Sequence, residues 1–319
     1  MIRRLTRWLL VLQALAAGGF AWAIMLLAHV QSLTLAVALG MVLVAIARLS
    51  ITANSFRLAW HFRSETPVVF QISWRSAARL FFNEFGASMI SSSWNMPFFR
   101  VGKYAAAQPV SLPVLLIHGY GCNSGYWHPM SKRLSAASIT HHGIDLEPVL
   151  AGIDGYVPAL AEAIEALAHD SNCDQVILVA HSMGGLAGRA YLRDHGSSRV
   201  AAMITLGTPH HGTALARHGI GINSAQMRCE IDGTASAWLQ RLQDNETAAT
   251  RALCVSFYSH HDNIVSPQLS AYLEGATNIA LAGIGHVAIG MDIAVQDCVV
   301  AQIRQVAAPL QARQSTSTT

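Results

Sequence analysis

The stretch QVILVAHSMGGLAGRAYLRDH, residues 175–195, decides the fold of this 319-residue chain. Its first part is an aliphatic run typical of a buried strand, and its second part has the composition of a helix. Ser182 lies at the junction, where a sharp turn would hold it in a sparsely allowed backbone conformation. Such a turn presses strand against helix, so the flanking positions, here Ala180 and Gly184, must be nearly free of side chain. The pattern predicts a nucleophilic serine, and the alternative is an ordinary helix-capping serine.

Short aliphatic runs alternate with amphipathic stretches through the rest of the chain beyond residue 109. This alternation indicates an α/β fold in which a doubly wound, mostly parallel sheet is covered on both faces. We expect this domain to occupy residues 109–312 and to hold its site at the carboxyl ends of the strands. The expected strands are Val114–His118, Val176–His181, Ala201–Gly207, Leu253–Tyr258 and Asn278–Ala282, with a helix at Val157–His169.

A glycine-rich loop, HGYG, follows the first of these strands. A serine that attacks an acyl group needs hydrogen-bond donors where negative charge grows on the carbonyl oxygen. We expect the backbone amides of Tyr120 and Met183 to supply them, because Met183 follows the serine directly. Gly119 and Gly121 let the loop approach the substrate, and His118 is expected to hold this loop and not to act as the base.

Two segments near the C-terminus supply the remaining residue types of a catalytic triad. Asp262 comes just after the expected strand Leu253–Tyr258, and His286 lies in a glycine-rich loop after the last strand. The order Ser182, Asp262, His286 is the one expected for the α/β-hydrolase arrangement. His286 would take the serine proton and Asp262 would orient the imidazole. The alternatives to Asp262 are Asp145, Asp154 and Asp292. None of these three acids directly follows a strong strand between the serine and the histidine.

The composition argues against several other classes of function. The net charge of +3 and the absence of a nucleic-acid motif give no reason to expect nucleic-acid binding. The histidine pairs at 141–142, 210–211 and 260–261 lack the spacing of a metal site, so we expect neither metal nor cofactor. The five cysteines have no CxxC spacing and are expected to be free thiols in a reducing compartment, although one disulfide remains open.

The N-terminus contains two apolar runs, Trp8–Ala28 and Val30–Ala47, joined by a link near His29–Ser32. Each is long enough for a transmembrane helix, so residues 1–50 are expected to form a membrane hairpin. Arginines flank the hairpin at both ends and are missing from the link, which predicts an inner-membrane protein with both ends and the catalytic domain on the cytoplasmic side. The alternative is a cleaved secretory signal, since Ala21-Trp22-Ala23 resembles a cleavage site.

Residues 51–108 combine many aromatic residues with arginines, and Ile72–Met89 has near-helical spacing. Two interpretations are equally favoured: the segment lies among lipid headgroups, or its aromatics pack on the catalytic domain. The last residues, 313–319, have the composition of a disordered tail.

The segments AHSMGG, HGYG, LGTPHHGT and SHHDNIVSP with NIALAGIGHVAIG resemble the bacterial lipases and esterases of the α/β-hydrolase superfamily, including the lidless Bacillus-type lipases. The resemblance covers about Leu112–Met291. It implies Ser182, Asp262 and His286 as the triad and the amides of Tyr120 and Met183 as the oxyanion hole. Gly212–Thr247 lies where such enzymes insert a lid, and its short, mixed composition predicts a small cap.

The first hundred residues lie outside this resemblance and add the membrane hairpin. Together the two parts predict a membrane-anchored serine hydrolase that cleaves lipid-like acyl esters. The alternatives are an acyltransferase or thioesterase on the same fold, or a non-enzymatic anchored scaffold.

Overall fold

Six parallel strands form a single sheet in the computed structural model, which describes residues 1–230 and 233–317. Their order across the sheet is β2-β1-β3-β4-β5-β6. The strands are β1 (Val114–Ile117), β2 (His141–Ile144), β3 (Val176–His181), β4 (Val200–Leu206), β5 (Cys254–Ser259) and β6 (Thr277–Leu281). Every neighbouring pair is parallel, so the carboxyl ends of all six strands meet at one edge. The prediction of a parallel α/β sheet is confirmed.

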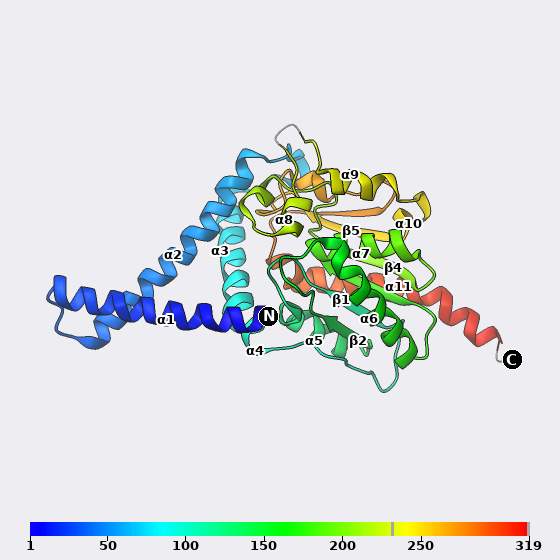
Figure 1. The fold of residues 1–319 in the computed structure, drawn as a ribbon, viewed down its shortest axis with the longest axis horizontal. Coiled ribbons are helices and arrows are strands. Elements are labelled where there is room, and N and C mark those ends of the chain that lie inside the picture. Colours follow the sequence, from blue (N-terminus) through cyan, green and yellow to red (C-terminus); the bar gives the residue numbers. More distant parts are fainter. Residues whose placement is uncertain (231–232, 318–319) are drawn as a thin grey trace.

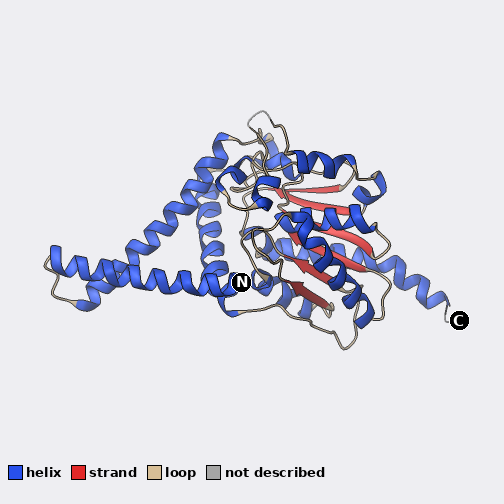
Figure 2. Cartoon of the chain, in the orientation of Figure 1, coloured by secondary structure: helices blue, strands red, loops and turns tan. Residues whose placement is uncertain are grey.

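Helices cover both faces of this sheet (Figure 2). Along β3, Leu178 and Ala180 belong to a core shared with α6 (Val157–Asp170) and α7 (Met183–His195). The intervening residue Val179 belongs to a second core with α5 (His128–Ala136) and α11 (Ile293–Ser317). Successive strand residues point to opposite faces, so a strand buried on both sides must be apolar throughout, as β3 is. The expected doubly wound arrangement is therefore correct.

Strand β2 is the strand that the sequence did not predict. It reads HHGI and has no aliphatic run, yet it pairs with β1 from Val114↔His141 to Ile117↔Ile144. Its place at the sheet edge explains the weak signal, because an edge strand needs less apolar surface than a central one. The five strands that we did expect agree with the structure to within about a residue at each end.

Two long N-terminal helices, α1 (Ile2–Leu27) and α2 (Leu33–His61), extend away from the sheet as a hairpin (Figure 1). Both are long and apolar enough to cross a membrane. They approach closely where Gly40 packs on the backbone of Ala17, a contact that leaves no room for a side chain at residue 40. Helix α2 continues to His61, so the domain boundary that we placed at residue 50 falls inside a continuous helix.

Helix α3 (Trp74–Ile90) lies between the hairpin and the sheet domain (Figure 1). Its buried residues Leu80, Glu84 and Ala87 are spaced by four and three positions and thus share one face. Trp74 and Phe82 are instead 76% and 62% exposed. One face of α3 is therefore buried, while large aromatic side chains on the same helix remain exposed.

The remaining elements are short, apart from the final helix. After α3 come a π-helical turn, η2 (Ser91–Asn95), and α4 (Met96–Phe98). The segment expected as a cap contains η5 (Ala214–His218), α8 (Ile222–Gln226) and α9 (Ala237–Asp244), followed by α10 (Ala248–Ala252). The other 3₁₀ turns are η1 (Val68–Phe70), η3 (Ser124–Trp127), η4 (Ile153–Tyr156), η6 (Gln268–Ala271) and η7 (Ala288–Gly290).

Helix α11 includes most of the segment that we expected to be a disordered tail. It extends to Ser317, so residues 313–317 of that tail are helical, and residues 318–319 lie outside the described residues.

Candidate active site

Ser182 occupies a strained turn between β3 and α7. Its backbone has φ 53° and ψ −127°, a conformation that residues with a side chain rarely adopt. A Cβ atom at Gly184 would lie 2.5 Å from the carbonyl oxygen of Ile117 and 2.6 Å from that of His118. Only glycine therefore allows α7 to approach the end of β1 so closely. The surrounding structure fixes the strain and presents the Ser182 hydroxyl at the edge where the strands end.

A chain of hydrogen bonds links Ser182, His286 and Asp262. His286 Nε2 lies 3.0 Å from Ser182 Oγ, and His286 Nδ1 lies 2.8 Å from Asp262 Oδ2. Because a carboxylate can only accept, Nδ1 carries the proton of the neutral ring and Nε2 accepts from the serine hydroxyl. The structure thus brings the three predicted residues together, although they are separated by up to 104 positions in the sequence.

The environment of His286 favours its protonated form. Burial lowers the pKa of His286, but the charge of Asp262, the hydrogen bond that His286 donates to that carboxylate and the charge of Glu84 together raise the pKa above its ordinary value. The imidazolium that forms when the ring takes the serine proton is therefore stabilised. His286 is only 5% exposed, so these interactions act with little screening by water.

The Asp262 carboxylate is fixed by its own loop. Its Oδ1 accepts from the backbone N–H groups of Ile264 at 2.8 Å and Val265 at 2.7 Å, which leaves Oδ2 to face His286. The next residue, Asn263, accepts from the backbone N–H of His286 through Oδ1 at 3.0 Å. Its amide group donates to Ser55 of α2 at 2.8 Å. The acid, the histidine and the hairpin are therefore connected through one short loop.

Glu84 of α3 supports the backbone just after His286. Its two carboxylate oxygens accept from the N–H groups of Val287 and Ala288, each at 2.9 Å. Burial raises the pKa of Glu84, and these two donors oppose that shift. A Cβ atom at Gly285 would lie 2.5 Å from the same carboxylate, so glycine is required there. Glu84, a residue of the N-terminal part of the chain, thus fixes the backbone of the loop that carries His286.

His181 supports the histidine loop from the side of the sheet. Its Nε2 lies 2.9 Å from the carbonyl oxygen of His286, to which it donates, and its ring stacks on Tyr126 with centroids 4.4 Å apart. Burial lowers the pKa of His181 well below its ordinary value, and the charge on His286 adds to this effect. The ring is therefore neutral and serves as a fixed donor.

The loop expected to form the oxyanion hole is held by His118, as its supporting role requires. His118 Nδ1 donates to the carbonyl oxygen of Gly119 at 2.9 Å, and Nε2 accepts from the N–H of Leu146 at 2.9 Å. Burial lowers the pKa of His118, which suits this neutral ring. A Cβ atom at Gly119 would lie 2.8 Å from Cβ of Ser182, and Gly121 has a positive φ of 65°.

The two amides expected as oxyanion donors lie at the same edge. Met183 is the first residue of α7, so no carbonyl of its own helix accepts from its N–H. The Tyr120 hydroxyl donates to the carbonyl oxygen of Ile220 at 2.8 Å and accepts from the N–H of the same residue at 3.0 Å. Its side chain is thus tied to the cap segment, and Tyr120 lines the cavity that contains Ser182.

The competing acids lie elsewhere and have structural partners. Asp145 accepts from the backbone N–H of Ser124 at 2.6 Å, and Asp292 accepts from Val295 in the first turn of α11. Asp154 accepts from Arg193 and from the indole N–H of Trp238. None of these hydrogen bonds involves His286. The five cysteines are free in the structure, as we expected.

Comparisons with known proteins agree with this geometry. Residues 113–252 match the family model described as alpha/beta hydrolase fold. Together with the parallel sheet and its helices on both faces, this match shows an α/β-hydrolase fold for that part of the chain. The structure is similar to the mature form of Bacillus licheniformis lipase BlEst2, with a TM-score of 0.52 and 18% identity over 63% of this chain and 94% of that chain. Aspergillus fumigatus lipase B gives a TM-score of 0.54 at 18% identity, over 62% of this chain and 53% of that enzyme. At these identities the likeness shows the fold.

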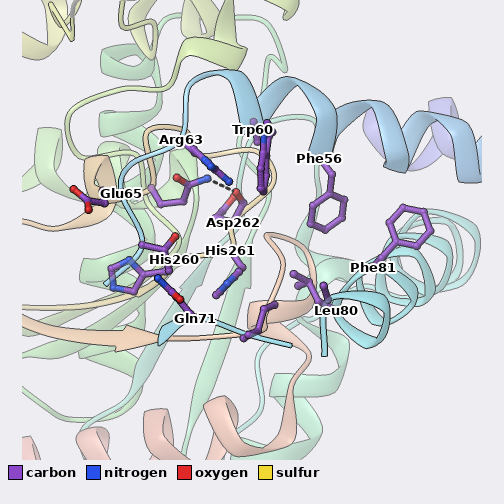
Figure 3. Close-up of a pocket in the computed structure, with 15 residues that line it drawn as sticks. Phe56, Trp60, Arg63, Glu65, Gln71, Leu80, Phe81, His260, His261 and Asp262 are labelled. Atoms are coloured by element: carbon purple, nitrogen blue, oxygen red, sulfur yellow. Dashed lines mark hydrogen bonds between the residues drawn. The ribbon is translucent and has the colours of Figure 1, made fainter. Parts of the chain in front are cut away.

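Two cavities flank α2 where this helix meets the hydrolase domain. One, of about 310 Å³, contains Ser182 and is lined by Ile51 and Leu58 of α2 and by the cap segment. The other, of about 620 Å³, lies between α2, α3 and the loop at His260–Asp262. Figure 3 shows Phe56 and Trp60 of α2 and Phe81 of α3 around it. Asp262 lines the larger cavity but Ser182 does not, so we assign the chemistry to the smaller cavity.

Sequence reasoning missed several residues that support the hydrolase site. Glu84, Asn263 and His181 all hold the loop of His286, yet none belongs to a recognisable motif. A signal for Glu84 was present, because residues 1–144 contain only two acidic side chains, Glu65 and Glu84. A single acid inside an apolar helix is costly to bury without partners and therefore predicts a specific contact.

Proposed function

We propose that this chain is a membrane-anchored serine ester hydrolase that cleaves lipid-like acyl esters through an acyl-enzyme intermediate. The observation that carries the proposal is the continuous hydrogen-bonded chain from Ser182 Oγ through His286 to Asp262, with distances of 3.0 and 2.8 Å. The strained backbone of Ser182 supports it, because such strain persists where the surrounding structure over-determines it and is concentrated at functional sites.

The geometry suits a two-step acyl transfer. Ser182 Oγ attacks the ester carbonyl while His286 Nε2 takes the hydroxyl proton, and the N–H groups of Met183 and Tyr120 donate to the oxygen that becomes negative. Collapse of the tetrahedral intermediate breaks the bond to the alcohol, which leaves with the proton from His286. A water molecule then attacks the acyl-enzyme, gives one proton to His286, and releases the carboxylic acid as Ser182 recovers its proton. Asp262 keeps the ring oriented and stabilises its charged form throughout.

The N-terminal hairpin supports a retained anchor in the inner membrane with the hydrolase domain on the cytoplasmic side. Both ends of the hairpin lie next to the domain, and the turn between α1 and α2 lies far from it (Figure 1). Arg3 donates to the carbonyl oxygen of Phe99 at 3.2 Å, and Arg7 donates to that of Pro97 at 2.9 Å. Both acceptors lie in the segment of residues 51–108, so the start of α1 is tied to a later part of the chain, a structural role that a cleaved signal would not have.

The test is hydrolysis of p-nitrophenyl esters by the full-length protein in detergent. Ser182→Ala should reduce kcat/KM to the background rate, since the nucleophile is removed. Ser198→Ala is the matched control, because Ser198 is exposed and lies three residues past the far end of α7. Equal activity of the Ser182→Ala variant and the wild type would overturn the proposal.

A further inference from the structure

We infer that the last turns of α2 form one wall of the acyl-chain subsite, so that a lipid chain passes from the bilayer to Ser182 along this helix. The inference rests on the proposed function and names the substrate that the site takes: an ester whose acyl chain is embedded in the membrane. Four residues of α2, Ile51, Asn54, Ser55 and Leu58, line the cavity that contains Ser182. Ser182 and the anchor helix α2 therefore line the same cavity.

The length of α2 places these residues where the helix leaves the membrane. Its 29 residues span about 43 Å at about 1.5 Å per residue. The hydrocarbon core is about 30 Å thick, so roughly the last two and a half turns extend beyond it. These turns contain Leu58, and Ile51 lies just before them, at the level where the core ends. Acyl chains in the bilayer thus lie next to the same helix that forms the cavity wall.

Two polar oxygens on the cavity-facing side of α2 already accept hydrogen bonds from other side chains. The Ser55 hydroxyl accepts from Asn263 at 2.8 Å, and Asn54 Oδ1 accepts from Arg57 at 2.9 Å. Ile51 and Leu58, seven positions apart and hence on one side of the helix, remain available. Ile51 is 71% exposed, so the apolar surface continues from the cavity to the outside of the protein.

Hydrogen bonds hold the end of α2 against the sheet domain. Ser266 donates to the carbonyl oxygen of Ala59 at 2.8 Å, and the N–H of Ser64, just past the helix end, donates to Gln268 at 3.0 Å. These bonds join α2 to the loop that follows Asp262.

The cavity volume limits what the subsite can hold. About 310 Å³ is at the lower end of the roughly 300–1,000 Å³ typical of sites that hold a whole ligand. We therefore assign the space to one acyl chain and not to a complete two-chain lipid.

The experiment compares p-nitrophenyl butyrate with p-nitrophenyl dodecanoate in detergent. Leu58→Trp narrows the cavity, and Ile51→Trp changes an exposed position at its mouth, so the second variant keeps the test valid if the first fails to fold. Each buried methylene contributes about fourfold to kcat/KM, so the loss of two or more lowers dodecanoate turnover by roughly tenfold or more. Butyrate turnover should fall much less than dodecanoate turnover, since a short chain buries fewer methylenes in this subsite. Ala53→Trp is the matched control, because Ala53 is exposed on α2 and does not line the cavity.

Binding of dodecanoic acid to the same proteins tests the acyl-chain subsite separately from the proposed hydrolase function. If wild type hydrolyses neither ester, the proposed function fails, and weaker binding of dodecanoic acid to Leu58→Trp and Ile51→Trp than to Ala53→Trp still supports the subsite. The inference would be overturned if Leu58→Trp and Ile51→Trp lost activity equally on both esters. It would also be overturned if neither of these two variants changed dodecanoate turnover or the binding of dodecanoic acid.

Discussion

Glu84→Gln tests how the N-terminal helices support the histidine loop. The Glu84 carboxylate accepts from Val287 and Ala288 at 2.9 Å each, but a glutamine keeps only one acceptor oxygen and places an NH₂ group against the second N–H. One buried N–H then loses its partner, at a cost of about 1–3 kcal/mol. We therefore expect the free energy of unfolding to fall by about that amount, and kcat/KM for p-nitrophenyl butyrate to fall about tenfold, because the loop that loses this support includes His286.

The pH profile separates this positioning role from a merely structural one. The charge of Glu84 contributes to the raised pKa of His286. Its removal lowers that pKa, so the acid limb of kcat/KM should move to lower pH, since the reaction needs the unprotonated ring. Glu65→Gln, the same change at an exposed position, is the control and should leave stability and the profile unchanged. A Glu84→Gln variant with the wild-type rate and the wild-type acid limb would refute the reasoning.

Three further outcomes follow from the structure. The raised pKa of His286 places the acid limb of wild-type kcat/KM above about 6.5, with activity rising as pH increases, and a midpoint below that value in a pH-rate titration would contradict the geometry. Gly184→Ala should strongly lower the melting temperature, because its Cβ would lie 2.5 Å from a backbone carbonyl oxygen, whereas Gly86→Ala, which meets nothing within 4 Å, should be neutral or stabilising by up to about 1 kcal/mol. Glu246→Gln should destabilise the fold by about 3–5 kcal/mol in denaturant titrations, because it leaves Arg189 buried and without its carboxylate. The control Glu165→Gln, in an exposed pair with Arg199, should change stability by no more than about 1 kcal/mol. Similar values for both variants would disprove the expected difference between the buried and the exposed ion pair.

The sequence predicted the features whose information is local. The strand, Ser182 and the helix after it lie within 21 consecutive residues, so the turn between them could be recognised without a tertiary model. The parallel sheet followed from the alternation of aliphatic runs and amphipathic stretches. Asp262 and His286 were found because each follows a strand, and the carboxyl ends of parallel strands meet at one edge.

The features that were missed depend on contacts between distant parts of the chain. Strand β2 has the sequence HHGI and is stabilised by its pairing with β1 more than by its own apolar content. The end of α2 carries polar residues that we assigned to a linker, yet the helix continues to His61 because Ser55 and Ala59 hydrogen-bond to the loop at residues 263–266. Glu84 lies 203 residues from its partner Val287, and no local pattern reveals such a pairing.

Labelling of the full-length protein with a fluorophosphonate, followed by peptide mass mapping, tests the central claim directly, because only a serine activated by a neighbouring base reacts readily. The account predicts one adduct, on the peptide that contains Ser182, with labelling slowed by orders of magnitude in His286→Ala and lost in Ser182→Ala. A wild-type protein that stays unlabelled, or one that reacts at another serine and keeps that adduct in Ser182→Ala, would contradict it.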